Sequence, residues 1–278
     1  MRSAVSRTFG DHLILAAVIA LAVMWLAPIF WVIGLSFKPN EVIMRSTGGL
    51  LSPPFTLKNY WDILATSAVF GWMLNSTIVA AGQTILTLAL STLAGYGFAR
   101  TDFPGKKIVF LLVLAGLAVP EQAIIVPLHT MFAELDLHNT YFGLIAPRLA
   151  VPFGVFLMTQ YFRGIPTEIE EAAMLDNASR LKIFFRVVLP LTIPAQATLG
   201  IYTFLHAWNE YFWPLVSATK PEMYTLTIGL AATQTNFAQT EGIGFLMAQA
   251  VFAGVPVLII YLFFQRHIVT AVSGGFAK

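Results

Sequence analysis

The chain has 278 residues, of which 57% are hydrophobic and 11% charged, and its mean hydropathy is +0.75. This is more apolar surface than one soluble core would bury, so the composition excludes an ordinary soluble protein and indicates an integral membrane protein. The absence of cysteine excludes disulfides and thiolate metal sites. The formal net charge of +2 comes with no basic, aromatic-interleaved patch, so no nucleic-acid partner is expected.

The first predicted element is a membrane-spanning helix. Residues 13–37 carry no charge and exceed the roughly 20 apolar residues that a bilayer core requires. The run is longer than the apolar region of a signal peptide and continues through Trp25, Pro28 and Trp31 to Lys38. We therefore expect a helix that stays in the mature protein.

Five further apolar runs predict five more spanning helices, at about residues 74–99, 108–132, 139–162, 191–216 and 242–264. Two longer segments, 38–70 and 217–241, are rich in Pro, Gly, Thr and Asn, and no low-complexity linker divides the chain. The expected fold is all-α. It is a polytopic membrane protein with six transmembrane helices, forming a single domain over residues 1–278.

The distribution of lysine and arginine predicts the orientation, because positively charged loops stay in the cytoplasm. With the N-terminus inside, the cytoplasmic segments contain Arg2, Arg7, Arg100, Lys106, Lys107, Arg163, Arg180, Lys182, Arg186, Arg266 and Lys278. The opposite side contains only Lys38, Arg45, Lys58 and Lys220. Both termini are therefore expected in the cytoplasm.

Three charged residues stand within the later predicted spans: Glu121, Arg148 and Glu210. A charge at the centre of a membrane helix costs roughly 2.5–3.5 kcal/mol on insertion scales unless it faces a cavity or a partner. All three are candidate residues of a translocation path. Structural alternatives stay open: Glu121 supporting a bend between Pro120 and Pro127, and Arg148 pairing or extending to the interface.

Glu210 also has an alternative interpretation, because aromatic residues surround it. Trp208, Tyr211 and Trp213 favour anchoring at a membrane interface. The five histidines contain no pair at a spacing of three or four, so we expect no metal site.

Residues 164–190 concentrate charge between two apolar runs. Thr167 and Glu170 have the spacing of a capping box and predict a helix over about 167–175. Asp176 and Asn177 favour a turn, and a second helix is expected from about Ser179 to near Pro190. Ile169, Ala172 and Ala173 share one face, which suits docking of another surface. By spacing alone, an ordinary polar loop is an equally good interpretation.

The stretch "EAAMLDNASRLKIFFRVVLPL" resembles the EAA signature of the inner-membrane permease subunits of binding-protein-dependent ABC importers. The matching positions are Glu171, Ala172, Ala173, Asp176, Ala178, Phe184, Leu189 and Pro190. Asn177 departs from the family's usual glycine, although asparagine tolerates the same positive-φ turn. Three other stretches are similar to carbohydrate-importer permeases of the maltose type: "LAGYGFARTDFPGKK" (93–107), "LHAWNEYFWPL" (205–215) and "LFFQRHIVTAVSGGFAK" (262–278). Of the two permeases in importers of that type, the chain is similar to the smaller one.

The resemblance implies a type I, MetI-like permease in a bacterial or archaeal inner membrane. Segment 164–190 would couple to a cytoplasmic ATPase dimer, through Glu168, Glu171, Ala172, Ala173, Asp176, Asn177, Ala178 and Arg180. A second, homologous permease would complete a heterodimer, and an extracytoplasmic solute-binding protein would deliver the sugar. Thr235, Asn236 and Gln239 of the outer loop would contact that binding protein, and the C-terminal tail would approach the ATPase.

The chain is not expected to be an enzyme or to bind a cofactor. "FPGKK" (103–107) and "GGFAK" (274–278) lack the spacing of a phosphate-binding loop, so ATP and Mg²⁺ would belong to the partner ATPase. A secondary transporter would need inverted repeats and an ion-coupling site, and a membrane enzyme would need a catalytic constellation; neither pattern is present. An importer for a non-sugar solute such as glycerol phosphate stays an alternative.

Overall fold

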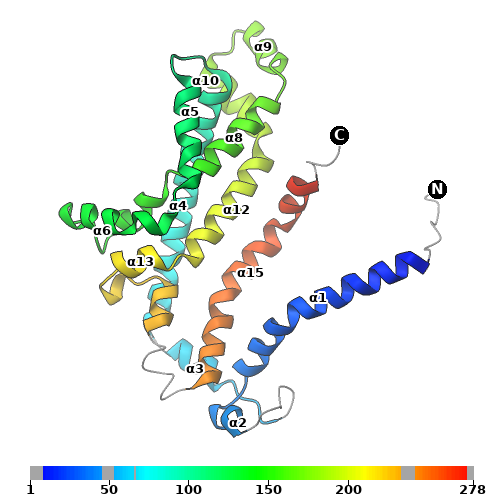
Figure 1. Cartoon of the computed structure of the whole chain (residues 1–278), viewed down its shortest axis with the longest axis vertical. Coiled ribbons are helices and arrows are strands. Elements are labelled where there is room, and N and C mark those ends of the chain that lie inside the picture. The colour runs from blue at the N-terminus through cyan, green and yellow to red at the C-terminus, as the bar shows by residue number, and fades with distance from the viewer. Residues whose placement is uncertain (1–8, 46–52, 66, 233–241, 274–278) are drawn as a thin grey trace. The chain divides into compact units, whose positions relative to one another are not determined.

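The computed structural model describes residues 9–45, 53–65, 67–232 and 242–273. These residues form helices, turns and irregular segments, with no strand among them, which agrees with the all-α prediction (Figure 1). They divide into two compact units, one drawn from residues 1–67 and 230–255 and the other from 68–229 and 256–278. The single domain over 1–278 stays a prediction.

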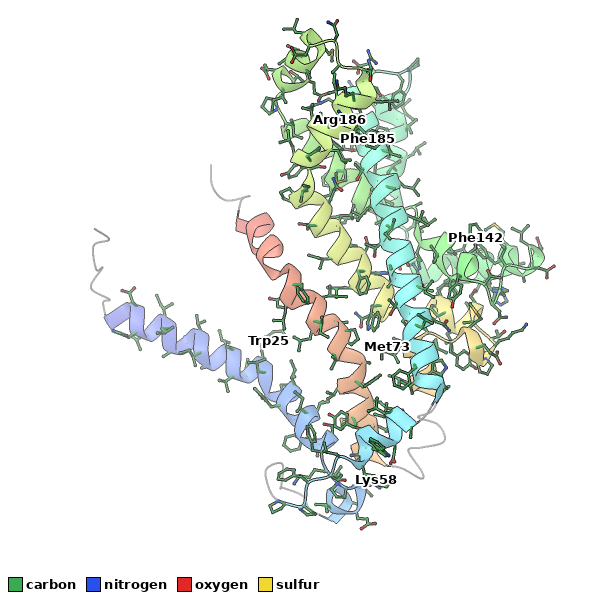
Figure 2. The ribbon with its side chains drawn as sticks, turned by 180° about the vertical axis from the view of Figure 1, so that it is seen from behind. Trp25, Lys58, Met73, Phe142, Phe185 and Arg186 are labelled. Atoms are coloured by element: carbon green, nitrogen blue, oxygen red, sulfur yellow. The ribbon has the colours of Figure 1, made fainter. Side chains whose placement is uncertain are left out.

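The first unit contains the first predicted span, α1 (Phe9–Ser36), followed by α2 (Asn40–Arg45) and α3 (Lys58–Ala65). Most large apolar side chains of α1 are exposed, Trp25 among them at 77%, as expected for a helix that faces lipid or a partner (Figure 2). The Asn59 amide donates hydrogen bonds to the carbonyls of Ser36 and Lys38, at 2.8 and 3.0 Å. This side chain therefore satisfies carbonyl groups at the end of α1.

The second unit is built on the long helix α4 (Ser67–Arg100). Shorter elements follow it: α5 (Lys106–Ala115), η1 (Gly116–Ala118), η2 (Glu121–Ile124), α6 (Ile125–Glu134), α7 (Tyr141–Ile145), η3 (Ala146–Arg148), α8 (Pro152–Gly164) and α9 (Glu168–Leu175). The remaining elements are α10 (Arg180–Ile183), the π-helical η4 (Phe184–Val188), α11 (Leu189–Leu191), α12 (Ile193–Asn209), α13 (Phe212–Ser217) and η5 (Pro221–Met223). Helix α15 (Ile243–Ser273) begins in the first unit and ends in the second.

Three described helices are long and apolar enough to cross a membrane: Gly10–Ser36, Ala68–Arg100 and Ile243–Phe263. Three bent pairs bring the number to six if each pair is one span: Lys106–Ala118 with Glu121–Glu134, Tyr141–Arg148 with Pro152–Gly164, and Arg180–Leu191 with Ile193–Asn209. Their bends are 96°, 54° and 73°. The six predicted spans are thus confirmed in number, although the fifth begins earlier than residue 191. Prolines 120, 152 and 194 adjoin the breaks, as expected for residues that remove a helix hydrogen bond.

The core of the second unit lies between α8, α10, η4 and α12. Its buried members include Met158, Phe162, Phe184, Val188 and Leu199, and Tyr96 of α4 packs against them. This core joins the predicted coupling segment to the spanning helices.

Helices α4 and α8 approach closely at Gly95. A Cβ atom at this position would lie 2.6 Å from the Met158 Cβ and 2.9 Å from the Thr159 nitrogen. We expect Gly95→Ala to lower the stability of the protein by about 1–3 kcal/mol, because the contacted atoms belong to a second helix and its backbone. Thermal unfolding of the purified protein measures this.

Gly97→Ala, on the same helix, is the matched control. A Cβ atom at Gly97 would have no neighbouring element within 4 Å. It should be neutral or stabilising, because alanine favours helix more than glycine does. Equal melting temperatures for the two variants would contradict the close approach at Gly95.

Candidate functional site

The three charged residues predicted within spans each lie at a helix break. Glu121 is the first residue of η2, Arg148 is the last residue of η3, and Glu210 is the C-cap of α12. The bends therefore place polar side chains and irregular backbone in the same region, which is tolerated at membrane depth only where protein or a cavity surrounds it.

Arg148 joins these breaks through its guanidinium group. Its Nη1 contacts the Glu121 carboxylate, and its Nη2 lies 3.0 Å from Glu210 Oε2. The side chains of Arg148 and Glu210 are each 12% exposed, so this ion pair is well shielded from solvent. Arg148 therefore forms ion pairs, which was one of the alternatives left open for it. Its role in a translocation path stays a prediction.

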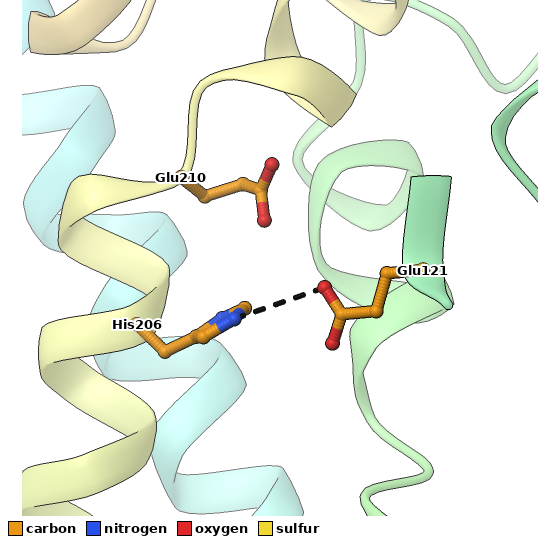
Figure 3. A group of neighbouring side chains, drawn as sticks. All are labelled: Glu121, His206 and Glu210. Atoms are coloured by element: carbon orange, nitrogen blue, oxygen red, sulfur yellow. Dashed lines mark ion pairs between the residues drawn. The ribbon is translucent and has the colours of Figure 1, made fainter. Parts of the chain in front are cut away.

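His206 is the member of the cluster that the sequence analysis missed. Its Nε2 lies 3.7 Å from Glu121 Oε2, and it faces Glu121 and Glu210 across a short gap (Figure 3). The available signal was its spacing of four from Glu210 near the end of α12. We call Glu121, Arg148, His206 and Glu210 the charged cluster.

Glu210 also has a local structural role. Its Oε1 accepts hydrogen bonds from the backbone nitrogens of Phe212 and Trp213, at 3.0 and 3.2 Å. Trp213 is 1% exposed and donates from Nε1 to the Gly143 carbonyl, and Trp208 is 4% exposed. The expected anchoring at a membrane interface is therefore wrong for both tryptophans, which this chain itself buries.

Ligand atoms of Glu121, His206 and Glu210 lie within 4.8 Å of one another, a spacing that a metal ion would need. However, the guanidinium of Arg148 contacts both carboxylates. A divalent cation would lie beside this positive charge and compete with it for the same oxygens. We therefore propose no metal at the cluster.

Two cavities, of about 500 and 430 Å³, share four lining residues: Glu121, Arg148, Tyr202 and His206. Both volumes fall in the range of small-molecule sites, roughly 300–1,000 Å³. Three members of the charged cluster thus line both cavities, and Glu210 lines the smaller one. This arrangement supports binding of a polar solute and contains no nucleophile paired with a base.

The predicted coupling segment contains a helix close to the expected bounds, α9 (Glu168–Leu175). The expected capping box is wrong, because the Thr167 side chain makes no capping hydrogen bond. Glu170 turns inward instead. Its Oε1 lies 2.5 Å from Arg100 Nε, its Oε2 accepts from the Tyr96 hydroxyl at 3.1 Å, and its side chain is 7% exposed.

Arg100 completes the attachment of α9 to α4. Its Nη2 donates a hydrogen bond of 2.6 Å to the Ile165 carbonyl, just before the start of α9. Because Arg100 ends α4, the helix with the EAA signature is held by a buried charge pair to the end of a spanning helix. The sequence pattern indicated a capping role for Glu170 and a cytoplasmic position for Arg100, but not that the two residues pair.

The turn after α9 has the expected form. Asn177 adopts a positive φ of 57°, and the Ser179 side chain accepts from the Lys182 nitrogen at the start of α10. Ala173 and Ala178 pack against the core, so Ala173 does not join Ile169 and Ala172 on the outer face. The other predicted coupling residues are exposed: Glu168, Glu171, Ala172, Asp176, Asn177 and Arg180.

The predicted contacts with a binding protein, Thr235, Asn236 and Gln239, lie outside the described residues. The same holds for residues 274–278 at the end of the predicted tail.

Bent apolar helices, cavities lined in part by charged side chains and a charged helix turn anchored to a long helix are together typical of a membrane transport protein. Residues 87–274 match the family described as the binding-protein-dependent transport system inner membrane component. The chain belongs to this family, and is therefore a permease subunit of an ABC importer.

Curated relatives agree with this assignment, and a solved structure has the same fold. The arabinooligosaccharides transport permease AraQ of Halalkalibacterium halodurans is 35% identical over 254 residues, covering 90% of each chain. The diacetylchitobiose uptake permease NgcG of Streptomyces coelicolor is 36% identical, covering 92% of this chain and 86% of the relative. A chain of a bacterial ABC transporter for alginate import has the same fold, with a TM-score of 0.82 at 22% identity, over 94% of this chain and 99% of that one.

Proposed function

We propose that this permease carries a saccharide across the membrane and receives the motion of a separate ATPase through α9. The named substrates of the two relatives, arabinooligosaccharides and diacetylchitobiose, support the choice of a saccharide. The charged cluster and its two cavities are proposed as part of the translocation path, with Glu121, Arg148 and Glu210 as its polar lining. ATP and Mg²⁺ are assigned to the ATPase, and this chain is assigned no catalytic residue or cofactor.

The observation that carries the coupling role is the contrast between the two faces of α9. The inner face is held by the buried Glu170 pair and by the packing of Ala173. The outer face exposes Met174 by 50% and Leu175 by 85%, next to charged Glu171. Exposed apolar side chains beside charges favour a protein partner over water alone.

The same proposal includes the rest of the assembly. The distribution of lysine and arginine supports cytoplasmic termini and a cytoplasmic α9. A second permease is proposed to complete the path as a heterodimer. A solute-binding protein on the opposite side is proposed to contact Thr235, Asn236 and Gln239. These assignments rest on the sequence and on membership of the family.

Charge reversal on the outer face of α9 tests the coupling role. We expect Glu171→Lys to reduce co-purification of the ATPase at least tenfold, because reversing a charge at an interface removes its electrostatic complementarity. The amount of permease in the membrane should not change, since the side chain is exposed. Quantitative pull-down from solubilised membranes measures both.

Glu222→Lys is the matched control, because Glu222 is exposed and the predicted topology places it on the opposite side. It should leave ATPase recovery unchanged. Normal ATPase recovery with Glu171→Lys would contradict docking at α9. Uptake of radiolabelled arabinotriose and diacetylchitobiose by the complete importer, with its binding protein, tests the saccharide assignment independently.

A further inference from the structure

The cavities beside the charged cluster have an aromatic wall. The rings of Phe153 on α8 and Tyr202 on α12 lie 5.2 Å apart, and the Tyr202 ring lies 6.1 Å from that of His206. All three residues line the larger cavity. Aromatic faces carry partial negative charge, which attracts the C–H groups on the apolar side of a sugar ring.

Hydrogen-bonding groups surround the same space. The Glu121 side chain is 47% exposed and His206 is 36% exposed, so both can reach a bound solute. Thr203 also lines the larger cavity, and its side chain is nearly fully buried. Its Oγ1 has no hydrogen-bond partner among the described residues, which is unusual for a buried hydroxyl.

We propose that this cavity is a saccharide subsite within the permease itself, in which a sugar ring lies against Phe153 and Tyr202 and its hydroxyls bind Glu121 and His206. This inference rests on the proposed saccharide transport. It extends that proposal by placing a binding site in this subunit.

The charges of the cluster select for an uncharged saccharide. Among the described residues that line either cavity, Arg148 is the side chain with a permanent positive charge, and its two guanidinium arms are occupied by Glu121 and Glu210. Two carboxylates thus face one guanidinium. A uronic acid or a phosphorylated sugar would be repelled by the two carboxylates. The guanidinium of Arg148 could not compensate, because both glutamates already engage it.

The test is direct binding to the permease and ATPase complex in nanodiscs, without the binding protein. The probes are radiolabelled diacetylchitobiose and arabinotriose as neutral saccharides, digalacturonate as an anionic one, and choline as a cation. We expect the complex to bind a neutral saccharide and to bind digalacturonate at least tenfold more weakly. Tyr202→Leu and Phe153→Leu should each raise the dissociation constant of the neutral saccharide by about tenfold.

Phe156→Leu is the matched control, because Phe156 is on α8 but does not line either cavity. It should bind the neutral saccharide as the wild type does. Absence of neutral-saccharide binding, binding of choline alone, or unchanged binding in Tyr202→Leu would each overturn the subsite. Equal affinity for digalacturonate would overturn the selection by charge. Normal saccharide uptake by the complete importer would leave the proposed function standing in all these cases.

Discussion

Arg100→Met is expected to abolish saccharide uptake and to destabilise the permease by about 3–5 kcal/mol, the usual cost of removing one partner from a buried ion pair. The Glu170 side chain, which is 7% exposed in the wild type, would lose its cation, and the Ile165 carbonyl would lose its donor. Helix α9 would then be held by the Tyr96–Glu170 hydrogen bond and by apolar packing. Thermal unfolding of the purified complex and uptake in proteoliposomes measure the two effects.

The double variant Arg100→Met with Glu170→Leu separates stability from coupling. It removes both charges, so no carboxylate is left unpaired, and most of the lost stability should return. Uptake should stay low if the pair orients α9 for the ATPase. Recovery of both stability and uptake would contradict a positioning role for the pair.

Asp102→Ala is the control for Arg100→Met. Asp102 pairs with Lys106 at 3.2 Å, but its side chain is fully exposed. Exposed pairs contribute little because water screens them. We therefore expect no measurable change in melting temperature or uptake.

Arg148→Met is the second substitution with a large expected effect. The Glu210 side chain, which is 12% exposed, would lose its cation. It would still accept hydrogen bonds from the backbone nitrogens of Phe212 and Trp213. We expect a loss of about 3–5 kcal/mol in stability and no measurable uptake. Arg148→Lys should fall between this variant and the wild type, because an ammonium group lacks the two-armed geometry that reaches both glutamates.

Arg163→Met is the matched control for Arg148→Met. The Arg163 guanidinium lies 5.4 Å from the centre of the Phe110 ring, and the residue is exposed. Loss of such a contact costs roughly 0.5–1 kcal/mol. Equal melting temperatures and equal uptake for the Arg148→Met and Arg163→Met variants would show that the charged cluster has no special role.

Much of the fold could be predicted from the sequence. Long apolar runs located the spans, because the hydrocarbon core of a membrane requires them wherever they occur. The end of α9 and the turn at Asn177 were predicted because local backbone preferences depend on adjacent residues. The bend near Glu121 was expected for the same reason, since proline removes a hydrogen bond from its own helix.

The interior positions of individual aromatic and polar side chains were less predictable. Trp213 suits a membrane interface by composition, yet it lies against α7 and donates to Gly143, 70 residues away in sequence. Thr167 and Glu170 have capping spacing, yet Arg100 is a stronger partner for the carboxylate than a backbone amide. In each case a distant residue displaced the local interaction.

The sequence by itself determined the membrane class, the family signature and the bounds of α9, because hydropathy and turn preference are properties of neighbouring residues. Only the tertiary structure decided that Glu121, Arg148, His206 and Glu210 meet, and that Glu170 is buried against Arg100. Glu121 and Arg148 are 27 residues apart, and Arg100 and Glu170 are 70 apart. Helix bends and close packing bring such pairs together, and no local pattern specifies which distant charge will compensate a buried one.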